Sequence, residues 1–337
     1  MTNRLISGIR MPIHPAVTDS FDRANAAIGS TETGEVWNGT NWTVNTNVAK
    51  SNPTLGSNLV LNSSFDSDTT NWTAVNATLA SVAGGISGNC LQVTNVGANK
   101  GYAYQQITTE IGKWYRVEIG YKNGTTTAEF GVGLSAGDYT YFYKPASSAS
   151  WTGRAVFFRA TTTTTFVSIG TQAATDGLTI FYDSIQFKEV TLAEMMCTID
   201  TTFSSLTMSV GVTGAQWSPN GLVLNVDSRS NPQNFVIAEI TGGSNTPSVS
   251  LIKCVNGVYT SVFSQNVTHV AGAPIRVRKI DIQYQLYYNN KPIGATQTIS
   301  DTEIIRNTIH GMWLPDNQAS LNNFSIEGGI RSSVVDM

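Results

Sequence analysis

The sequence of 337 residues predicts an all-β protein made of two antiparallel β-sandwich domains, one inserted into the other. Three observations lead to this prediction. Apolar and polar residues alternate with a period of two in short runs between about residues 58 and 326, as they do in half-buried strands. Clusters of Gly, Asn, Pro or Ser separate these runs at intervals of roughly 8–12 residues, which is typical of sandwiches and barrels. Helical periodicity is nearly absent.

Individual strands and turns can be placed from the same patterns. Residues 117–121 (VEIGY) and 275–278 (IRVR) alternate cleanly, so each is predicted to be a strand with one buried face. Asn-Gly at 256–257 predicts a tight hairpin, because both residues accept the positive φ angles of a type I′ turn. Asn-Asn at 289–290 predicts the next hairpin, and residues 191–196 (TLAEMM) predict one short helical turn.

The distribution of strand candidates predicts the domain organisation. Residues 1–18 contain two prolines and are expected to form an N-terminal arm, and residues 329–337 a C-terminal tail. Residues 19–54 hold two or three strand candidates, too few to close a core alone. Residues 55–190 hold enough for a complete domain, and residues 191–328 hold a similar number. We therefore expect 19–54 and 191–328 to form one sandwich, interrupted by an inserted domain at 55–190.

The composition excludes some classes of partner. Charged residues make up 13% of the chain, about half of the usual share of roughly 25%. The net charge is −3 and no stripe of Lys and Arg is visible, which argues against nucleic acid as a partner. No run of apolar residues approaches the roughly 20 that a membrane-spanning helix needs. We expect neither nucleic-acid binding nor membrane insertion.

The two chain segments that form the predicted split sandwich resemble a known family. The segment DSFDRA (19–24), followed by Trp37 and Trp42, resembles the opening of concanavalin A-like, laminin-G-like jelly-roll domains. Later segments are similar to the rest of that fold in order and spacing, namely residues 251–259, 275–277, 287–290, 300–301, 310–311 and 322–326. The resemblance implies a jelly-roll sandwich.

The predicted insert resembles a second family. The segment NLVLNSSFD (58–66), followed by Trp72, is similar to the first motif of carbohydrate-binding modules of the family 4, 9 and 22 type. YQQI (104–107) with GKWY (112–115), and IFYDSI (180–185), resemble later strands of those modules. This resemblance implies a second jelly roll and the binding of a polysaccharide or a cell-surface glycan.

Sugar recognition needs flat aromatic faces for the apolar side of the ring, and amides or carboxylates for its hydroxyls. The candidates in the insert are Tyr102, Tyr104, Gln106, Tyr139, Tyr141 and Tyr143. Residues two apart in a strand share one face. The first three are therefore expected to point the same way, as are the last three, with Phe142 on the opposite face. The alternative interpretation is that these aromatic residues pack in the core.

A structural calcium ion is implied by the same resemblance, since such modules often bind one near their first and last strands. Asp66 and Asp183 would supply carboxylates, Asn62 is a weaker candidate, and backbone carbonyls would complete an oxygen shell. The alternative is that Asp66 lies in a turn and that the Asp183 carboxylate accepts backbone hydrogen bonds.

Enzymatic activity is not expected. Concanavalin-like glycosidases carry two acids alternating on one strand, E-x-D-x-E, so that both point into the cleft. The sequence has no such run, and its three histidines are scattered without a metal-binding spacing. His310 is expected to be structural.

A place of action can be predicted from the absence of an export signal, the unpaired count of three cysteines and the short arm. Together with the two resemblances, since phage tails and capsids often display modules of both kinds, these features imply a bacteriophage virion protein, made in the host cytoplasm and displayed on the capsid or tail surface as an adhesion protein. The arm would bind other virion proteins, and a homo-oligomer is expected. The alternatives are a structural capsid-decoration or tail-assembly protein without a sugar ligand and, third, a glycan-degrading enzyme.

Overall fold

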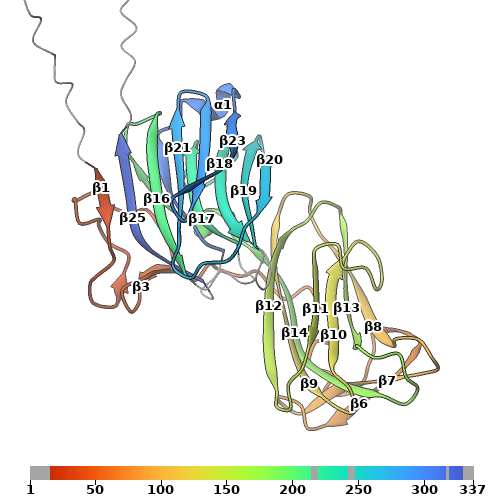
Figure 1. Ribbon diagram of the computed structural model, residues 1–337. Coiled ribbons are helices and arrows are strands. Elements are labelled where there is room, and N and C mark those ends of the chain that lie inside the picture. Colours follow the sequence, from red (N-terminus) through yellow and green to blue (C-terminus); the bar gives the residue numbers. More distant parts are fainter. Residues whose placement is uncertain (1–15, 214–218, 242–246, 316–318, 329–337) are drawn as a thin grey trace, which may run out of the picture. The chain divides into compact units, whose positions relative to one another are not determined.

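The computed structural model describes residues 16–213, 219–241, 247–315 and 319–328 (Figure 1). Most of the predicted arm and all of the predicted tail lie outside the described residues. The chain divides into two compact units. The split unit comprises Met1–Pro53 and Ala193–Met337, and the inserted unit comprises Thr54–Leu192. The boundaries drawn from the sequence differ from these by no more than two residues (55 against 54, and 190 against 192).

The split unit is a two-sheet β-structure. Among the described residues, its larger sheet has nine strands in the order β2-β3-β4-β25-β16-β21-β22-β23, with β1 also paired to β25. These strands are β1 (Val17–Asp19), β2 (Ala26–Ala27), β3 (Trp42–Val44), β4 (Ala49–Ser51), β16 (Leu206–Thr213), β21 (Pro274–Ile280), β22 (Gln283–Tyr288), β23 (Lys291–Thr298) and β25 (Ser320–Gly328). The pairings are antiparallel.

The smaller sheet of the split unit has six described strands in the order β15-β24-β17-β18-β19-β20. They are β15 (Met196–Asp200), β17 (Asn220–Val226), β18 (Phe235–Thr241), β19 (Ser248–Val255), β20 (Val258–Asn266) and β24 (Ile309–Trp313), again antiparallel. The alternation predicted for residues 275–278 is confirmed, since Ile275 and Val277 are fully buried while Arg278 is exposed. Burying each such side chain contributes about 1.5–3 kcal/mol.

The inserted unit consists of two five-stranded antiparallel sheets in the described residues. One has the order β11-β10-β13-β8-β5 and the other the order β12-β9-β14-β7-β6. The strands are β5 (Thr73–Val75), β6 (Ala77–Ala83), β7 (Asn89–Asn95), β8 (Tyr102–Thr108), β9 (Trp114–Asn123), β10 (Ala128–Gly133), β11 (Phe142–Ala146), β12 (Thr152–Arg159), β13 (Thr164–Thr171) and β14 (Thr179–Val190). A single hydrophobic core contains side chains from both sheets. The predicted all-β class is confirmed.

The two ends of the inserted unit lie side by side. Leu55 forms a bridge with Val190 at the end of β14. The N–H of Gly56 donates to the carbonyl of Glu189 at 2.9 Å, and the N–H of Leu59 donates to that of Phe187 at 2.8 Å. Adjacent ends allow a domain to be inserted into a loop with little disturbance.

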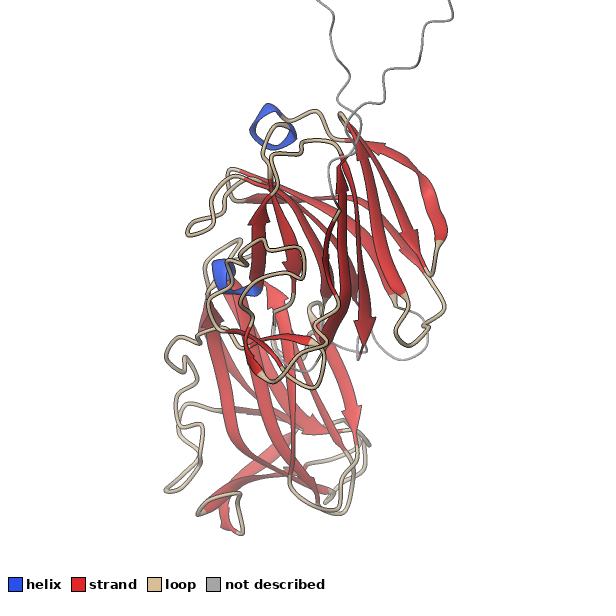
Figure 2. Cartoon of the chain, turned by 90° about the vertical axis from the view of Figure 1, so that its left-hand side faces the viewer, coloured by secondary structure: helices blue, strands red, loops and turns tan. Residues whose placement is uncertain are grey.

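The predicted turns are confirmed. Asn256 and Gly257 have φ angles of 51° and 76° and join β19 to β20. Asn289 and Asn290 have φ angles of 48° and 62° and join β22 to β23. The predicted helical turn is a 3-10 helix at Leu192–Met195, and a second short helix, α1 (Thr302–Ile305), was not expected from the sequence (Figure 2). No helix in the described part of the chain is long and apolar enough to cross a membrane.

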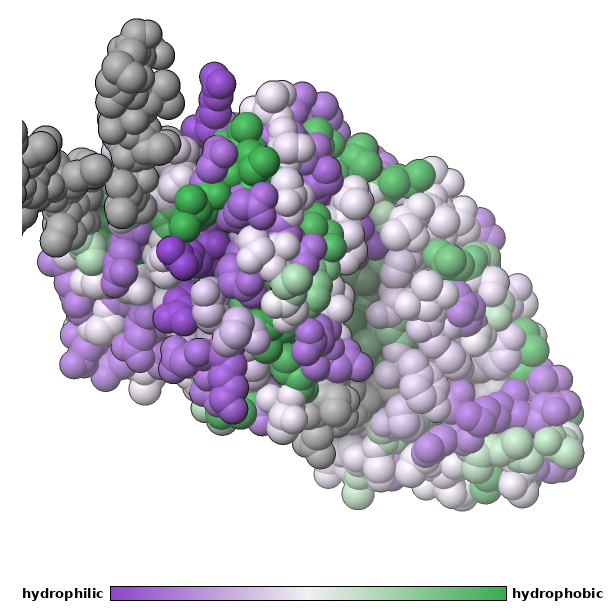
Figure 3. Space-filling view, turned by 45° about the horizontal axis from the view of Figure 1, so that its top comes forward, coloured by the Kyte–Doolittle hydropathy of each residue, from purple (hydrophilic) through white to green (hydrophobic). Residues whose placement is uncertain are grey.

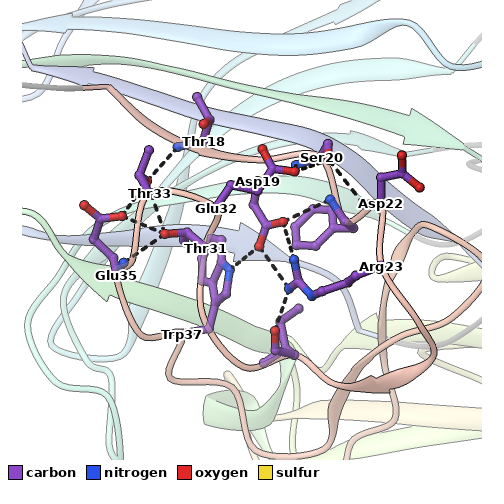
Figure 4. Close-up of polar contacts among 12 residues, drawn as sticks. Thr18, Asp19, Ser20, Asp22, Arg23, Thr31, Glu32, Thr33, Glu35 and Trp37 are labelled. Atoms are coloured by element: carbon purple, nitrogen blue, oxygen red, sulfur yellow. Dashed lines mark hydrogen bonds and ion pairs between the residues drawn. The ribbon is translucent and has the colours of Figure 1, made fainter.

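The first motif of the split unit is explained by one buried carboxylate. Asp19 is fully buried and accepts two hydrogen bonds from the Arg23 guanidinium, at 2.6 and 3.1 Å (Figure 4). It also accepts the Trp37 indole N–H at 2.8 Å and the backbone N–H of Phe21 at 2.9 Å. The spacing of Asp, Phe and Arg in DSFDRA therefore serves one hydrogen-bonded cluster. Val17 is buried in β1 next to it, so the predicted arm ends earlier than residue 18.

Candidate functional site

The candidate site lies on the outward face of the β11-β10-β13-β8-β5 sheet. On β8, Ala103 and Ile107 point into the core, so Tyr102, Tyr104 and Gln106 point outward. In register with Tyr102 across the sheet lie Gly170 on β13 and, beyond it, Glu129 on β10. We call this side of the sheet the tyrosine face. Tyr102, Tyr104 and Gln106 therefore point to the same side of the sheet, as predicted from their spacing along the strand.

Glu129 is the centre of a polar cluster on the tyrosine face. Its side chain is only 5% exposed. Oε1 accepts the hydroxyl of Tyr139 at 2.9 Å, and Oε2 accepts the hydroxyl of Tyr143 at 3.1 Å. The Lys100 ammonium forms an ion pair with Oε2. A nearly buried carboxylate is therefore stabilised by one cation and two hydroxyl donors.

The two tyrosines next to Glu129 remain protonated donors. Burial raises the pKa of Tyr139, and the adjacent Glu129 charge raises it further. Burial and the hydrogen bond to Glu129 likewise raise the pKa of Tyr143. The two rings contact each other with centroids 4.8 Å apart. Tyr143 is 42% exposed, so this pair reaches from the buried carboxylate to the surface.

Glycines make room for the segment that carries Tyr139. A Cβ atom at Gly131 would lie 2.1 Å from Cδ1 of Tyr139 and 2.6 Å from the Phe142 carbonyl oxygen, so this ring lies directly on the strand backbone. The segment is fixed from both ends. Asp138 Oδ2 accepts the N–H of Leu134 at 2.6 Å, and the N–H of Gly137 donates to Ser168 Oγ at 2.9 Å.

A residue from the opposite sheet supports the strands beneath Glu129. The single proton of the Tyr182 hydroxyl is shared between the carbonyl oxygens of Glu129, at 3.0 Å, and Gly170, at 2.6 Å, and the hydroxyl oxygen accepts the N–H of Gly170 at 3.1 Å. Tyr182 is fully buried. Because this side chain bridges β10 and β13 at the register position of Glu129, it holds the floor of the site in place.

These residues enclose a cavity of about 360 Å³, which we call the glutamate hollow. It is lined by Lys100, Gly101, Tyr102, Glu129, Ala136, Gly137, Tyr139, Gly170 and Thr171. The Tyr102 hydroxyl has no hydrogen-bond partner among the described residues. The hollow thus combines aromatic walls with unused hydrogen-bonding capacity.

A second cavity of about 550 Å³, the leucine hollow, lies at the β5 side of the same sheet. It is lined by Leu59, Leu61, Asn71, Thr73, Tyr104, Gln105, Gln106, Ile107 and Thr108. Its leucine wall is held against β8 because Gln105 exchanges hydrogen bonds with the backbone of Leu61, at 2.8 and 3.0 Å. Tyr102 in one hollow and Tyr104 in the other contact each other, with ring centroids 6.4 Å apart.

Tyr141 does not join the other predicted residues. Strand β11 begins only at Phe142, and residues 140–141 form a bend, so the strand alternation expected from residue 139 onward does not form there. The Tyr141 ring stacks on Phe158 with centroids 4.5 Å apart, and both Tyr141 and Phe142 pack against the core. The predicted common face of Tyr139, Tyr141 and Tyr143 is therefore wrong for Tyr141.

The predicted metal ligands Asp66 and Asp183 lie against one turn, residues 84–89. Asp183 accepts the N–H groups of Ile86 and Ser184, each at 2.6 Å, and Asp66 accepts the N–H of Asn89 at 3.3 Å. Burial raises the pKa of Asp183, while its backbone hydrogen bonds lower it and the negative charge of Asp66 raises it. The two carboxylates are thus near enough to repel each other.

Asn62 belongs to a different turn. Its side-chain amide donates to Asp68 Oδ1 and to the carbonyls of Asp68 and Thr70, each at 3.0 Å. No cluster of three or more His, Cys, Asp or Glu side chains suited to a metal occurs in the described ranges. A calcium ion would therefore be held by Asp66 and Asp183 together with carbonyl oxygens or water, a donor set that Ca²⁺ accepts.

Sequence reasoning missed Glu129 and Lys100. Lys100 lies in a loop 29 positions before Glu129, and only the folded sheet brings them together. One signal was available. In AEFGVG (128–133) a single carboxylate shares its strand face with two glycines. A face of small residues around one acid is unusual for plain packing and fits a close approach of another group.

Comparisons with known proteins assign no family. No family model and no curated protein matches the sequence. Carbohydrate-binding module CBM66 from Bacillus subtilis is 12% identical over 40% of this chain and 81% of its own, with a TM-score of 0.32. A CBM4 structure is 16% identical over 39% and 99%, with a TM-score of 0.32. The CBM22-1–CBM22-2 tandem domain of Xyn10C from Paenibacillus barcinonensis is 11% identical over 83% and 100%, with a TM-score of 0.35. Similarities this weak decide nothing about what this chain binds.

Proposed function

We propose that this chain binds a glycan at the tyrosine face and catalyses no reaction on it. The observation that carries the proposal is the glutamate hollow, where Tyr102 and Tyr139 form walls around the Glu129 carboxylate and the Lys100 ammonium. Aromatic faces suit the apolar side of a sugar ring, and convergent charged groups suit its hydroxyls. Because Tyr139 and Tyr182 fix the surrounding backbone and rings, little ordering is needed on binding.

The absence of catalysis is part of the proposal. Glycosidases of the usual type need two carboxyl groups, about 5 Å apart for retention or roughly 6.5–9.5 Å for inversion. Within the described residues that line the two hollows, Glu129 is the one carboxylate. Each of its two oxygens already accepts at least one partner, Tyr139 on Oε1 and Tyr143 with Lys100 on Oε2, which leaves about one acceptor position. This arrangement suits hydrogen bonding to a ligand better than proton transfer to a leaving group.

A large flat apolar patch would favour a purely structural role in assembly. On the faces in view in Figure 3, hydrophobic residues are scattered among polar ones. Two exposed leucines of the inserted unit, Leu59 and Leu61, border the leucine hollow beside Gln106. These features favour a binding face over an assembly surface.

Affinity electrophoresis of the full chain through gels containing soluble polysaccharides tests the proposal. A suitable panel is xylan, mixed-linked β-glucan, galactomannan, arabinan, polygalacturonate and chitosan. At least one should retard the chain, and Tyr102→Ala should weaken that retardation about tenfold, which corresponds to about 1.4 kcal/mol. The control is Tyr287→Ala, a half-buried tyrosine of the split unit. Retardation by none of the six, or equal loss in both variants, would refute the proposal.

We propose further that Ca²⁺ binds between Asp66 and Asp183 and steadies the turn at 84–89. The ion would offset the repulsion between the two carboxylates. Calorimetry of the full chain should show a transition that shifts upward with calcium, by an amount equivalent to about 2.7 kcal/mol at a hundredfold excess over Kd. The shift should vanish with chelator and in Asp66→Asn. The same melting temperature in calcium and in chelator would contradict calcium binding between Asp66 and Asp183.

Display on a bacteriophage particle is a separate proposal, supported by the sequence features alone. On this proposal the chain attaches the particle to a glycan on the outside of a cell, binds other virion proteins through its N-terminal arm, and forms a homo-oligomer. Mass spectrometry of purified particles from cells that carry the gene would detect the chain as a particle component. Recovery of the chain only in the particle-free fraction would contradict virion display.

A further inference from the structure

The glutamate hollow is lined by two charged side chains of opposite sign. Lys100 and Glu129 are the charged members of its nine described lining residues, and they pair with each other. The ligand therefore meets a cavity with no net charge. The two partners differ in accessibility, because the Lys100 side chain is 46% exposed and that of Glu129 is 5% exposed.

The pair keeps unused hydrogen-bonding capacity on both sides. An ammonium has three N–H donors and a carboxylate has about four lone-pair positions. Lys100 uses one donor on Glu129, while Glu129 accepts from Lys100, Tyr139 and Tyr143. Two donors and about one acceptor position remain, next to the Tyr102 hydroxyl, which has no partner in the described structure.

Adjacent hydroxyl groups on a sugar ring fit this combination. One hydroxyl can donate to Glu129 while its neighbour accepts from Lys100, so neither charge is left unpaired. A uronate carboxylate would lie beside Glu129, and the ammonium of an amino sugar would lie beside Lys100. Like charges brought together in a partly desolvated site are strongly disfavoured.

We infer that the glutamate hollow selects neutral sugar residues with two adjacent free hydroxyls, and that the Lys100–Glu129 pair determines this selectivity. The inference rests on the proposed glycan binding at the same face and specifies the class of ligand. Each partner excludes sugars of its own charge sign, so removal of Glu129 should admit anionic sugars and removal of Lys100 should admit cationic ones.

The test compares the full-length wild type with Lys100→Met and Glu129→Gln in gels containing a neutral polysaccharide of the panel, polygalacturonate or chitosan at pH 6. The quantity compared is the retardation that is lost when Tyr102→Ala is added to each protein. This difference removes the retardation that comes from general electrostatic attraction between the protein and a charged polymer. The wild type should prefer the neutral polymer at least tenfold over both charged ones. Glu129→Gln should gain about tenfold for polygalacturonate, and Lys100→Met should gain about tenfold for chitosan.

A chemical change in the ligand tests the hydroxyl pair separately. Periodate cleaves the bond between two carbons that bear adjacent hydroxyls, and borohydride then reduces the aldehydes to alcohols. The neutral polymer treated in this way should lose its Tyr102-dependent retardation of the wild type. A treated polymer that binds as well as the untreated one would overturn the inference.

Failure of glycan binding and failure of the charge selectivity give different results. If no polymer gives Tyr102-dependent retardation, the proposed function is wrong. If such retardation exists but both variants keep the charge preference of the wild type, the function stands and the inference is wrong. Calorimetric melting confirms that the variants fold, and if Glu129→Gln unfolds, the half-exposed Lys100→Met decides the question alone.

Discussion

The Asp19→Ala variant should unfold with about 3 kcal/mol less free energy than the wild-type chain. The fully buried carboxylate receives Arg23, the Trp37 indole and the Phe21 backbone N–H. Its removal leaves the guanidinium of Arg23, whose side chain is 29% exposed, and the buried indole N–H without that acceptor. A buried donor that is left without an acceptor lowers the free energy of unfolding by more than its hydrogen bond had contributed.

Calorimetry of the full chain measures this loss as a lower melting temperature. For a domain of this size, each kcal/mol corresponds to roughly 2–4 °C. Asp22→Ala is the matched control, because Asp22 is an exposed carboxylate three positions later in the same segment. If the two variants have the same melting temperature, the hydrogen bonds to Asp19 do not stabilise the split unit in the way described.

Acidification from pH 7 to pH 4 should destabilise the split unit through His310. This histidine is fully buried. Its Nδ1 accepts the N–H of Asn225 at 3.1 Å, and Nε2–H donates to the Phe203 carbonyl at 2.8 Å. Burial lowers the pKa of His310 from 6.5 to about 4, the hydrogen bond to Phe203 opposes this, and the Lys279 charge lowers the pKa further.

The direction of the effect follows from the proton balance. Between about pH 6.5 and pH 4 the unfolded chain binds a proton at this histidine and the folded chain does not. The stability that neutral, buried His310 contributes to the split unit is therefore fully present above about pH 6.5 and is lost as the pH falls towards 4. The difference amounts to about 3 kcal/mol.

Melting temperatures across this pH range measure the effect. Other acids titrate in the same range, so the comparison is between variants. His310→Gln should start less stable at pH 7 and should show a smaller fall on acidification than the wild type. His269→Gln, in the loop before β21, should keep the wild-type fall. Equal falls in all three proteins would show that His310 does not govern the acid response.

The sequence predicted those features that depend on neighbouring residues. The 256–257 and 289–290 turns follow from residues that tolerate positive φ angles, and the strands follow from alternation. Where the local pattern is altered by a side-chain contact, prediction failed. The chain bends at residues 140–141 and β11 begins only at Phe142, where the Thr140 hydroxyl donates to Asp138 at 2.6 Å, so the alternation expected through Tyr141 does not form.

The centre of the site depends on contacts between distant segments. Glu129, Lys100 and Tyr143 meet because β10 pairs with β11 and β13, and because the turn after β10 folds back over Gly131. Nothing in the local sequence around Lys100 specifies that register. Tyr102 and Tyr104 were accessible to prediction because one strand places both, whereas their charged neighbours required the folded sheet.

Glycan binding in the glutamate hollow can be observed in a crystal structure of the full chain with a short oligosaccharide, released from the polysaccharide that retards it most. We expect a sugar ring in the glutamate hollow, against Tyr102 and Tyr139, with ring hydroxyls within hydrogen-bond distance of Glu129 and Lys100. An oligosaccharide bound to the split unit, or to the β12-β9-β14-β7-β6 sheet, with the glutamate hollow free of sugar, would contradict it.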